Sequence, residues 1–192
     1  MSLNRHATDT EDVHFRVIAP LPTPVPNLYR PALDIAMPVH DQARELARAV
    51  GRLRSFLRHA FPFSARITIV DCASSDSTRD VASSLAADLV GVRLIRLNEF
   101  GRGRALAAAW MTSDARVVAS AEAGLDIDMS GLPLLIAPVI SGHSEISVGA
   151  RFKALRADVA RRLIPSVVNR SWFFDAELLL RARRAGMRIH AA

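Results

Sequence analysis

The sequence has a single cysteine, Cys72, in 192 residues, which excludes an intrachain disulfide and any zinc site built from several cysteines. Lysine is equally rare, because every cation except Lys153 is an arginine. No stretch reaches the roughly 18 apolar residues of a membrane span, and residues 1–16 carry charges where a signal peptide needs an apolar core. We therefore expect a cytoplasmic protein of a reducing compartment, with attachment to the cytoplasmic face of a membrane as an alternative.

Positive charge is in excess, with 25 Lys and Arg residues against 19 Asp and Glu residues. This balance suits partners that carry phosphate, but it does not choose between nucleotides, phospholipid head groups and nucleic acid. A basic stripe with interleaved aromatics is absent from the sequence, so nucleic acid is not the expected partner. A run of arginines lies near the end of the sequence: Arg181, Arg183, Arg184 and Arg188. We expect this run to be either a solvated helix face or a contact with an anionic membrane.

The composition and hydrophobic pattern of the chain change near residue 31. Residues 1–31 are polar and then proline-rich, which predicts a flexible or extended leader. Residues 32–192 alternate apolar runs with helical periods and have the length of a single domain. We expect strands at residues 33–39, 66–70, 92–97, 116–121 and 145–149, and helices at about residues 43–57, 77–87, 103–111 and 132–140. From residue 151 onward we expect mostly helix, clearest over residues 172–185.

This alternation predicts an α/β fold with a mostly parallel sheet and helices on both faces. Ligands of such sheets bind beyond the carboxyl ends of the strands. In two of these loops the polar residues either meet a ligand or only cap a helix. Asp41 is placed to cap the helix at residues 43–57, and Ser77 with Asp80 has capping-box spacing. The loop "GRGRAL" is either a glycine turn or an approach to phosphate through its amides and through Arg102 or Arg104.

Taken in order, these loops resemble the motifs of a known enzyme family. They are "MPVHD", "VDCASSDST", "GRGRAL", an acidic loop "AEAGLDID", "VGAR" and, near the end, "WFFDAELLLRARRAGMRI". The set is similar to the family 2 glycosyltransferases of the GT-A fold, and within them to the dolichyl-phosphate mannose and polyprenyl-phosphate sugar synthases. The resemblance implies a three-layer α/β/α domain with a Rossmann-like, mostly parallel sheet. It also implies transfer of a hexose, with inversion, from a nucleotide-diphosphate sugar to a polyprenyl phosphate, assisted by Mg²⁺ or Mn²⁺.

The resemblance also assigns roles to individual residues. It places Pro38, His40, Asp41 and Asp71 beside the nucleotide, and it gives Arg102 the position of a lysine in the glycine turn. Arg151 takes the position of an arginine that faces phosphate. Asp175 and Glu177 match an acidic pair near the acceptor. On this basis the catalytic residues are expected to be Asp175, Glu177 and Arg151.

The sequence departs from the family pattern at the metal loop. Glu122 falls on the first carboxylate of the family's Asp-x-Asp motif, and Gly124 falls on the second. Asp126 and Asp128 have the right spacing but lie four residues later, so they would serve only if the loop folds back. Because a bridging divalent ion needs hard oxygen ligands, we expect the metal site to be lost or weakened rather than moved.

A second departure is an apparent internal deletion, since Arg151 runs directly into Phe152, Lys153 and Ala154, without the segment that separates these motifs in the family. The sequence therefore leaves three hypotheses: an active glycosyltransferase, a catalytically impaired relative that binds nucleotide or a partner, and, most remotely, a nucleic-acid-binding protein. Cys72 is expected to be a small buried side chain. The aromatic residues at 172–174 are expected to pack the last helix on the core, or else to edge an acceptor groove.

Overall fold

The computed structural model describes residues 30–122, 129–149 and 152–191. Within these residues, seven strands form one mixed sheet in the order β3-β2-β1-β4-β6-β5-β7. The strands are β1 (Leu33–Val39), β2 (Ala65–Cys72), β3 (Val92–Leu97), β4 (Val117–Ser120), β5 (Ile146–Val148), β6 (Lys153–Arg156) and β7 (Ile189–Ala191). The first four strands are parallel, and only β6 runs against its neighbours. The mostly parallel sheet that the sequence predicts is therefore confirmed.

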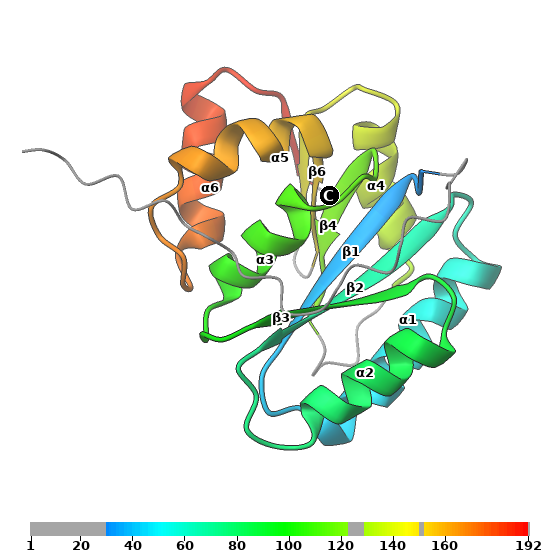
Figure 1. Ribbon diagram of the computed structural model, residues 1–192. Helices are drawn as coiled ribbons and strands as arrows, with labels where there is room; N and C mark the ends of the chain where they lie inside the picture. Colours follow the sequence, from blue (N-terminus) through cyan, green and yellow to red (C-terminus); the bar gives the residue numbers. More distant parts are fainter. Residues whose placement is uncertain (1–29, 123–128, 150–151, 192) are drawn as a thin grey trace, which may run out of the picture.

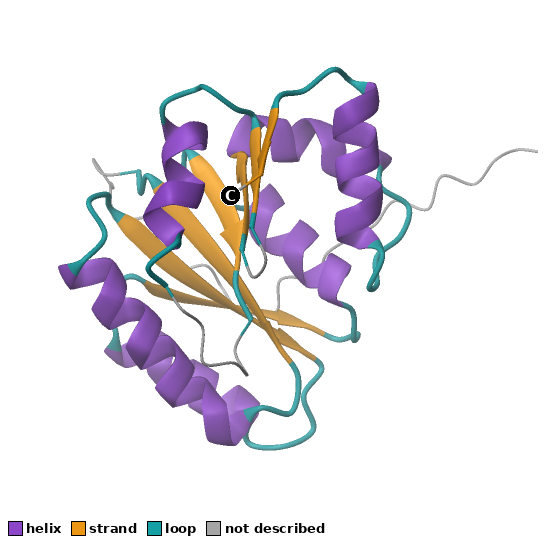
Figure 2. Ribbon diagram, turned by 180° about the vertical axis from the view of Figure 1, so that it is seen from behind, coloured by secondary structure: helices purple, strands orange, loops and turns teal. Residues whose placement is uncertain are grey.

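Helices cover both faces of the sheet (Figures 1 and 2). One face packs against α1 (Ala43–His59), α2 (Thr78–Asp88) and α4 (Leu132–Ile140). The other face packs against α3 (Arg102–Met111), α5 (Ala157–Leu163) and α6 (Phe174–Arg184), with a short 3-10 turn (Ile164–Ser166) after α5. This gives the three-layer α/β/α architecture that the sequence predicts.

The apolar periodicity of the sequence explains these layers. In α1, Leu46, Val50, Leu53 and Leu57 recur at helical spacing and form the buried stripe. In β1, side chains from both faces are buried, because helices cover the sheet on each side: Leu33 and Ile35 join one hydrophobic cluster while Ala36 joins the other.

The prediction of a mostly helical end is wrong in part. Residues 153–156 form β6, which pairs with β4 on one side and with β5 on the other. Residues 189–191 form β7, which pairs with β5. These short segments have no strand periodicity of their own, so their extended conformation comes from backbone hydrogen bonds to strands that are distant in sequence. The remainder of this region, α5 and α6, is helical as expected.

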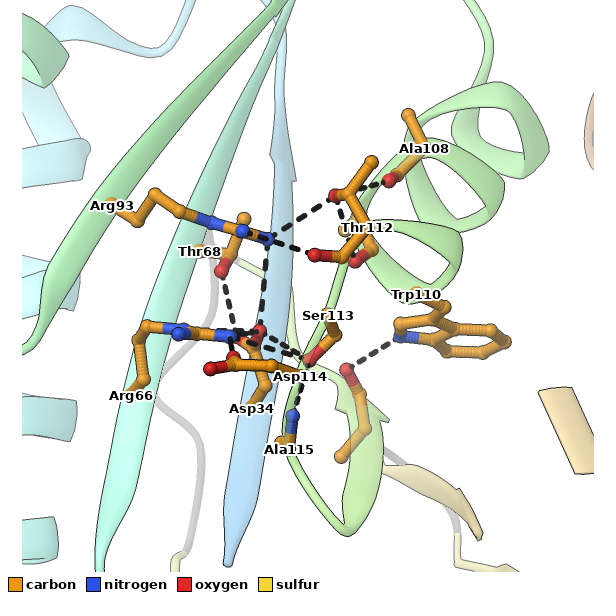
Figure 3. A network of polar contacts seen from close by, with 12 residues as sticks. Asp34, Arg66, Thr68, Arg93, Ala108, Trp110, Thr112, Ser113, Asp114 and Ala115 are labelled. Carbon is orange, nitrogen blue, oxygen red and sulfur yellow. Dashed lines mark hydrogen bonds and ion pairs between the residues drawn. The ribbon is translucent and has the colours of Figure 1, made fainter. Parts of the chain in front are cut away.

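A buried charged network joins the amino-terminal ends of the first strands (Figure 3). Asp34, whose side chain is only 2% exposed, accepts hydrogen bonds from Arg66 Nη2 at 2.6 Å and from Thr68 Oγ1 at 2.6 Å. Ser113 Oγ donates to the same carboxylate at 2.7 Å, and Arg66 also contacts Asp114 at 2.7 Å. The network therefore fixes the loop between α3 and β4 to β1 and β2, at the edge of the sheet opposite the carboxyl ends.

Candidate active site at the carboxyl ends of the strands

The strand register brings several sequence-predicted residues to one edge of the sheet. Val39, at the end of β1, pairs with Asp71 near the end of β2, and Cys72 pairs with Leu97 at the end of β3. Pro38 pairs with Val70 inside the sheet, so its ring is part of β1 and only partly exposed. Glu122 is exposed two residues after β4. Three other predicted residues, Asp126, Asp128 and Arg151, lie outside the described residues, as does most of the predicted leader.

The loops after β1 and β2 are locked together by two carboxylates. Asp41 adopts a left-handed backbone (φ 49°), and its Oδ1 accepts hydrogen bonds from the amides of Ser75 at 2.7 Å and Asp76 at 3.2 Å. These bonds lower the pKa of Asp41. Asp76 in turn accepts from the amide of Thr78 at 2.8 Å and from that of Ala43 at 3.3 Å. Asp76 thus serves the first turns of both α1 and α2.

Two capping predictions are therefore wrong. Asp41 does not cap α1, which begins after Gln42, because the carboxylate of Asp41 is turned toward the neighbouring loop. Ser77 stands at the N-cap position of α2 but makes no side-chain capping hydrogen bond there, and the amide of Thr78 donates to Asp76 instead. The polar residues of both loops hold the shape of the sheet edge, which leaves Asp71 as the acidic side chain at the end of β2 itself.

Asp71, His40 and Phe100 form the centre of this edge. Asp71 is buried, and its Oδ1 accepts a hydrogen bond from the amide of Ser74 at 3.2 Å. His40 Nδ1 lies 2.8 Å from the carbonyl oxygen of Cys72. Because a carbonyl oxygen only accepts, Nδ1 is the protonated ring nitrogen and donates this hydrogen bond. The His40 ring meets the edge of Phe100 with 4.9 Å between ring centroids, and Phe100 is 55% exposed. Sequence reasoning missed Phe100, since a single aromatic before a glycine turn gives no signal.

The Cys72 side chain is buried beneath this edge, as expected. Burial and the nearby charge of Asp71 raise the pKa of the Cys72 thiol to about 11. The thiol therefore stays protonated at neutral pH, which does not suit a nucleophile.

The glycine turn lets α3 approach the start of α6 closely. A Cβ atom on Gly103 would lie 2.6 Å from Cβ of Phe174 and 2.8 Å from the backbone carbon of Arg170. The Arg104 amide also donates to the carbonyl of Arg170 at 3.0 Å. A residue without a side chain is therefore required at position 103, and its role is to bring the first turn of α6 to the site.

This close approach joins three charged residues from three separate motifs. Arg102 Nη2, at the start of α3, lies 3.2 Å from Asp175 Oδ2, in the first turn of α6. Lys153 Nζ, at the start of β6, lies 3.2 Å from the same oxygen. The other oxygen, Oδ1 of Asp175, is buried without a hydrogen-bond partner in the described part of the chain. Arg102 and Asp175 are predicted site residues, whereas Lys153 was missed.

Glu177, the other member of the predicted acidic pair, faces a different set of groups. It accepts hydrogen bonds from the amides of Val168 at 3.1 Å and Asn169 at 2.8 Å, and it pairs with Arg181 at 2.6 Å. These donors lower the pKa of Glu177 to about 2. The Glu177 carboxylate thus holds the loop before α6 in place. It lies two residues after Asp175, so it projects from a different side of α6 than the Arg102–Asp175–Lys153 cluster.

Side chains that could coordinate a metal ion are few in this part of the fold. Across residues 30–122, 129–149 and 152–191, no three His, Cys, Asp or Glu side chains gather in a way that would hold a metal ion. Glu122 is positioned to supply a single carboxylate, and further ligands would have to come from a bound substrate or from water. The described residues alone therefore do not make a metal site.

The aromatic residues at the start of α6 divide between core and surface. Phe174 is buried against Trp110, as expected for packing on the core. Trp172 and Phe173 are 71% and 70% exposed, so the expectation that they also pack on the core is wrong. Among the described helices, none combines the length and the apolar character that crossing a membrane requires.

Comparisons with known proteins bear on the family and the fold. The sequence pattern of glycosyl transferase family 2 matches residues 34–189. Glycosyltransferase AglD of Haloferax volcanii is 23% identical over 197 residues, which cover 82% of this chain but only 32% of that protein.

Solved structures with the same fold include two sugar transferases in complex with Mn²⁺. The mannosyltransferase PcManGT from Pyrobaculum calidifontis, solved with GDP-Man and Mn²⁺, is 16% identical with a TM-score of 0.69 over 86% of this chain and 55% of that chain. The glucosyl-3-phosphoglycerate synthase of Mycobacterium tuberculosis, solved with Mn²⁺ and UDP, is 12% identical with a TM-score of 0.66 over 84% of this chain and 69% of that chain. This chain therefore spans part of the length of its relatives. It has the GT-A fold and belongs to glycosyl transferase family 2.

Proposed function

We propose that the chain is an inverting hexosyltransferase domain that moves a sugar from a nucleotide-diphosphate sugar to a polyprenyl phosphate. The observation that carries this proposal is the convergence of Asp71, Arg102, Lys153 and Asp175 at the carboxyl edge of the sheet. A nucleotide needs a buried acceptor for its base or ribose, and a diphosphate needs cations. Asp71 supports the first role and Arg102 with Lys153 supports the second, and these residues come from different strands and helices at this one edge.

The donor's nucleoside is assigned to the ends of β1 and β2. Asp71 is held in place by the Ser74 amide, and its carboxylate is suited to accept hydrogen bonds from a base or ribose. The His40 ring is held by the carbonyl of the next residue, Cys72, and packs against the Phe100 ring, and we assign this pair as an aromatic wall for the nucleoside. Asp41 contributes indirectly, since it fixes the loop that carries Ser74 and Ser75.

The reaction itself requires charge stabilisation more than proton transfer. An oxygen of the acceptor phosphate forms a bond to the anomeric carbon, and the bond from that carbon to the nucleotide diphosphate breaks with its electron pair on the diphosphate. The acceptor oxygen is already an anion, so no proton has to be removed. Arg102 and Lys153 are positioned to offset the developing negative charge, and Asp175 orients both cations.

A divalent ion would add a Lewis acid beside the diphosphate. Glu122 is the described residue that would hold it, and Asp126 and Asp128 are the alternative ligands. We expect Glu122→Ala to reduce any Mn²⁺-dependent gain in donor affinity, and an Asp126→Ala/Asp128→Ala variant to keep it. An equal response to Mn²⁺ in wild type and both variants would reject both ligand sets.

Calorimetry with UDP- and GDP-sugars, with and without Mn²⁺, tests the proposal. We expect one donor to bind, and we expect Asp71→Asn to weaken binding by roughly 10-fold to 100-fold, as for loss of a hydrogen bond to a charged group. Asp80→Asn, an exposed change on α2, is the matched control and should leave affinity unchanged. Failure to bind any nucleotide sugar would remove the proposal.

A second candidate, a catalytically impaired relative, is favoured by the sparse metal ligands of the described residues. It predicts donor binding without transfer. Radiolabelled sugar transfer to a polyprenyl phosphate distinguishes the two candidates, since only an active enzyme yields a labelled lipid product.

A further inference from the structure

The outward face of α6 carries an apolar surface that the fold does not bury. Trp172, Phe173 and Leu180 are 71%, 70% and 47% exposed. Helical spacing places Phe173, Ala176, Leu180 and Arg184 on one side of the helix, opposite the buried Phe174, Leu178 and Ala182. We call this face the α6 surface; it comprises Trp172, Phe173, Ala176, Leu180, Arg183 and Arg184.

The α6 surface differs from the other exposed apolar positions because its members are contiguous. Val90 and Leu134 are also exposed, but they stand apart on the opposite layer, after α2 and on α4. Beside the α6 surface, Phe100 and the 80% exposed Val168 line a shallow hollow with Arg104 and Arg170. Scattered apolar side chains are normal on a protein surface, whereas a contiguous group indicates an interaction site.

The charge around the α6 surface is positive. Its neighbouring carboxylates are already neutralised, because Glu99 pairs with Arg104 at 2.6 Å, Glu177 pairs with Arg181 at 2.6 Å, and Asp175 pairs with two cations. Arg183 and Arg184, in the last turn of α6, are exposed and form no ion pair within the described residues. A partner for this face must therefore combine apolar and anionic character.

We infer that the α6 surface docks on an anionic lipid bilayer. Trp and Phe side chains partition into the head-group region, and basic residues beside them are attracted to anionic lipids. The 11 residues of α6 are too few to span a bilayer, so the helix lies on it. Asp175 occupies the first turn of the same helix, so docking brings the candidate active site to the membrane surface. The inference deepens the proposed function, because a polyprenyl phosphate acceptor resides in such a bilayer.

Tryptophan fluorescence offers a direct test, because the chain has only two tryptophans and Trp110 is buried. Vesicles of phosphatidylcholine with about one third phosphatidylglycerol, free of polyprenyl phosphate, are added to the full chain. We expect the emission of Trp172 to shift to shorter wavelength. Trp172→Phe should abolish the shift while preserving co-sedimentation with the vesicles.

Paired variants distinguish vesicle binding through the α6 surface from non-specific vesicle binding. Trp172→Ser/Phe173→Ser should lower vesicle affinity by about tenfold or more, whereas the control Val90→Ser/Leu134→Ser should change it less than about twofold. Arg184→Gln should lower vesicle affinity by about fivefold, and Arg58→Gln, in the last turn of α1, should not. Far-UV circular dichroism checks that each variant is folded.

Three results would overturn the inference: equal binding of wild type to pure phosphatidylcholine vesicles, absence of vesicle binding, or equal losses in the control variants. Self-association in sedimentation velocity that Trp172→Ser/Phe173→Ser abolishes would instead assign the surface to a second copy of the chain. Donor affinity measured by calorimetry is independent of all these results, so failure of membrane docking and failure of the proposed function are distinguishable.

Discussion

Lys153 Nζ lies 3.2 Å from Asp175 Oδ2, the same oxygen that Arg102 contacts at 3.2 Å. Lys153 begins an antiparallel strand and Asp175 lies in the first turn of a helix, so the contact forms only in the complete fold. It places two cations and one carboxylate where the proposed diphosphate would leave.

Asp175→Asn tests whether the acceptor is an anion. With a phosphate acceptor we expect kcat/KM to fall by no more than about tenfold, because no general base is needed and Arg102 and Lys153 remain. An enzyme that acts on a hydroxyl would lose roughly 100-fold to 10,000-fold instead. The double change Arg102→Gln/Lys153→Gln should be more severe than Asp175→Asn, since it removes the positive charge itself. A larger loss in Asp175→Asn than in the double variant would contradict the assigned roles.

Gly103→Ala should destabilise the protein by about 1–3 kcal/mol, because the new methyl group would overlap Phe174 and the backbone of Arg170. Gly51→Ala is the matched control: it adds the same group to an exposed position of α1 that has no atom within 4 Å. That change should stabilise the protein by about 0.5–1 kcal/mol through helix propensity. Urea unfolding of both variants measures the difference, and equal effects would refute the close packing of α3 on α6.

Asp34→Asn should destabilise the protein by about 3–5 kcal/mol, because it leaves the partly buried Arg66 with a weaker partner and removes the buried charge that also faces Arg93 at 3.7 Å. Asp114→Asn breaks a half-exposed contact of the same Arg66 and should cost about 1 kcal/mol or less. Donor affinity should be unchanged in both variants, since the network lies at the opposite edge of the sheet. A change in calorimetric donor affinity without a change in stability would count against this separation.

Acid should weaken the fold between about pH 4.5 and pH 2. Hydrogen bonds from Arg188 lower the pKa of Glu145 from 4.5 to about 2, and the amides of Asn169 and Val168 with Arg181 lower that of Glu177 from 4.5 to about 2. Between these pH values the unfolded chain binds more protons than the folded chain, so the free energy of unfolding rises with pH. The stabilisation from these two carboxylates is present above about pH 4.5 and is lost as the pH falls toward 2. Glu145→Gln/Glu177→Gln should flatten this part of a stability profile measured by thermal melting. An unchanged slope would show that these contacts do not form.

The sequence anticipates most of the fold because its apolar periods are local. Residues 33–39, 92–97 and 132–140 form the expected elements at the expected positions. Residues 153–156 do not, because four residues have too short a period to be diagnostic and their extended form depends on β4 and β5. Sequence reasoning also misassigned Asp41, since a cap and a loop cross-link need the same residue type.

The candidate site was predictable where it follows strands that run in the common direction. Asp71 lies at the carboxyl end of β2 and Arg102 follows β3, so their shared edge follows from the topology of a parallel α/β sheet. Lys153 is the first residue of its strand, and it reaches that edge only because β6 is antiparallel to β4. The positions of Trp172 and Phe173 on the surface were likewise unpredictable, because an aromatic run fits either a core or an interface.

The burial of Cys72 gives the chain a chemical reporter at the candidate site. Its thiol is the only one in the sequence, and it is buried and protonated in the native state. The carbonyl of the same residue accepts the hydrogen bond from His40. Maleimide can therefore reach the sulfur only when the end of β2 opens, so the alkylation rate measures that opening. A nucleotide sugar seated against Asp71 would slow the labelling in proportion to its occupancy, which turns one buried atom into a binding assay without radioactivity.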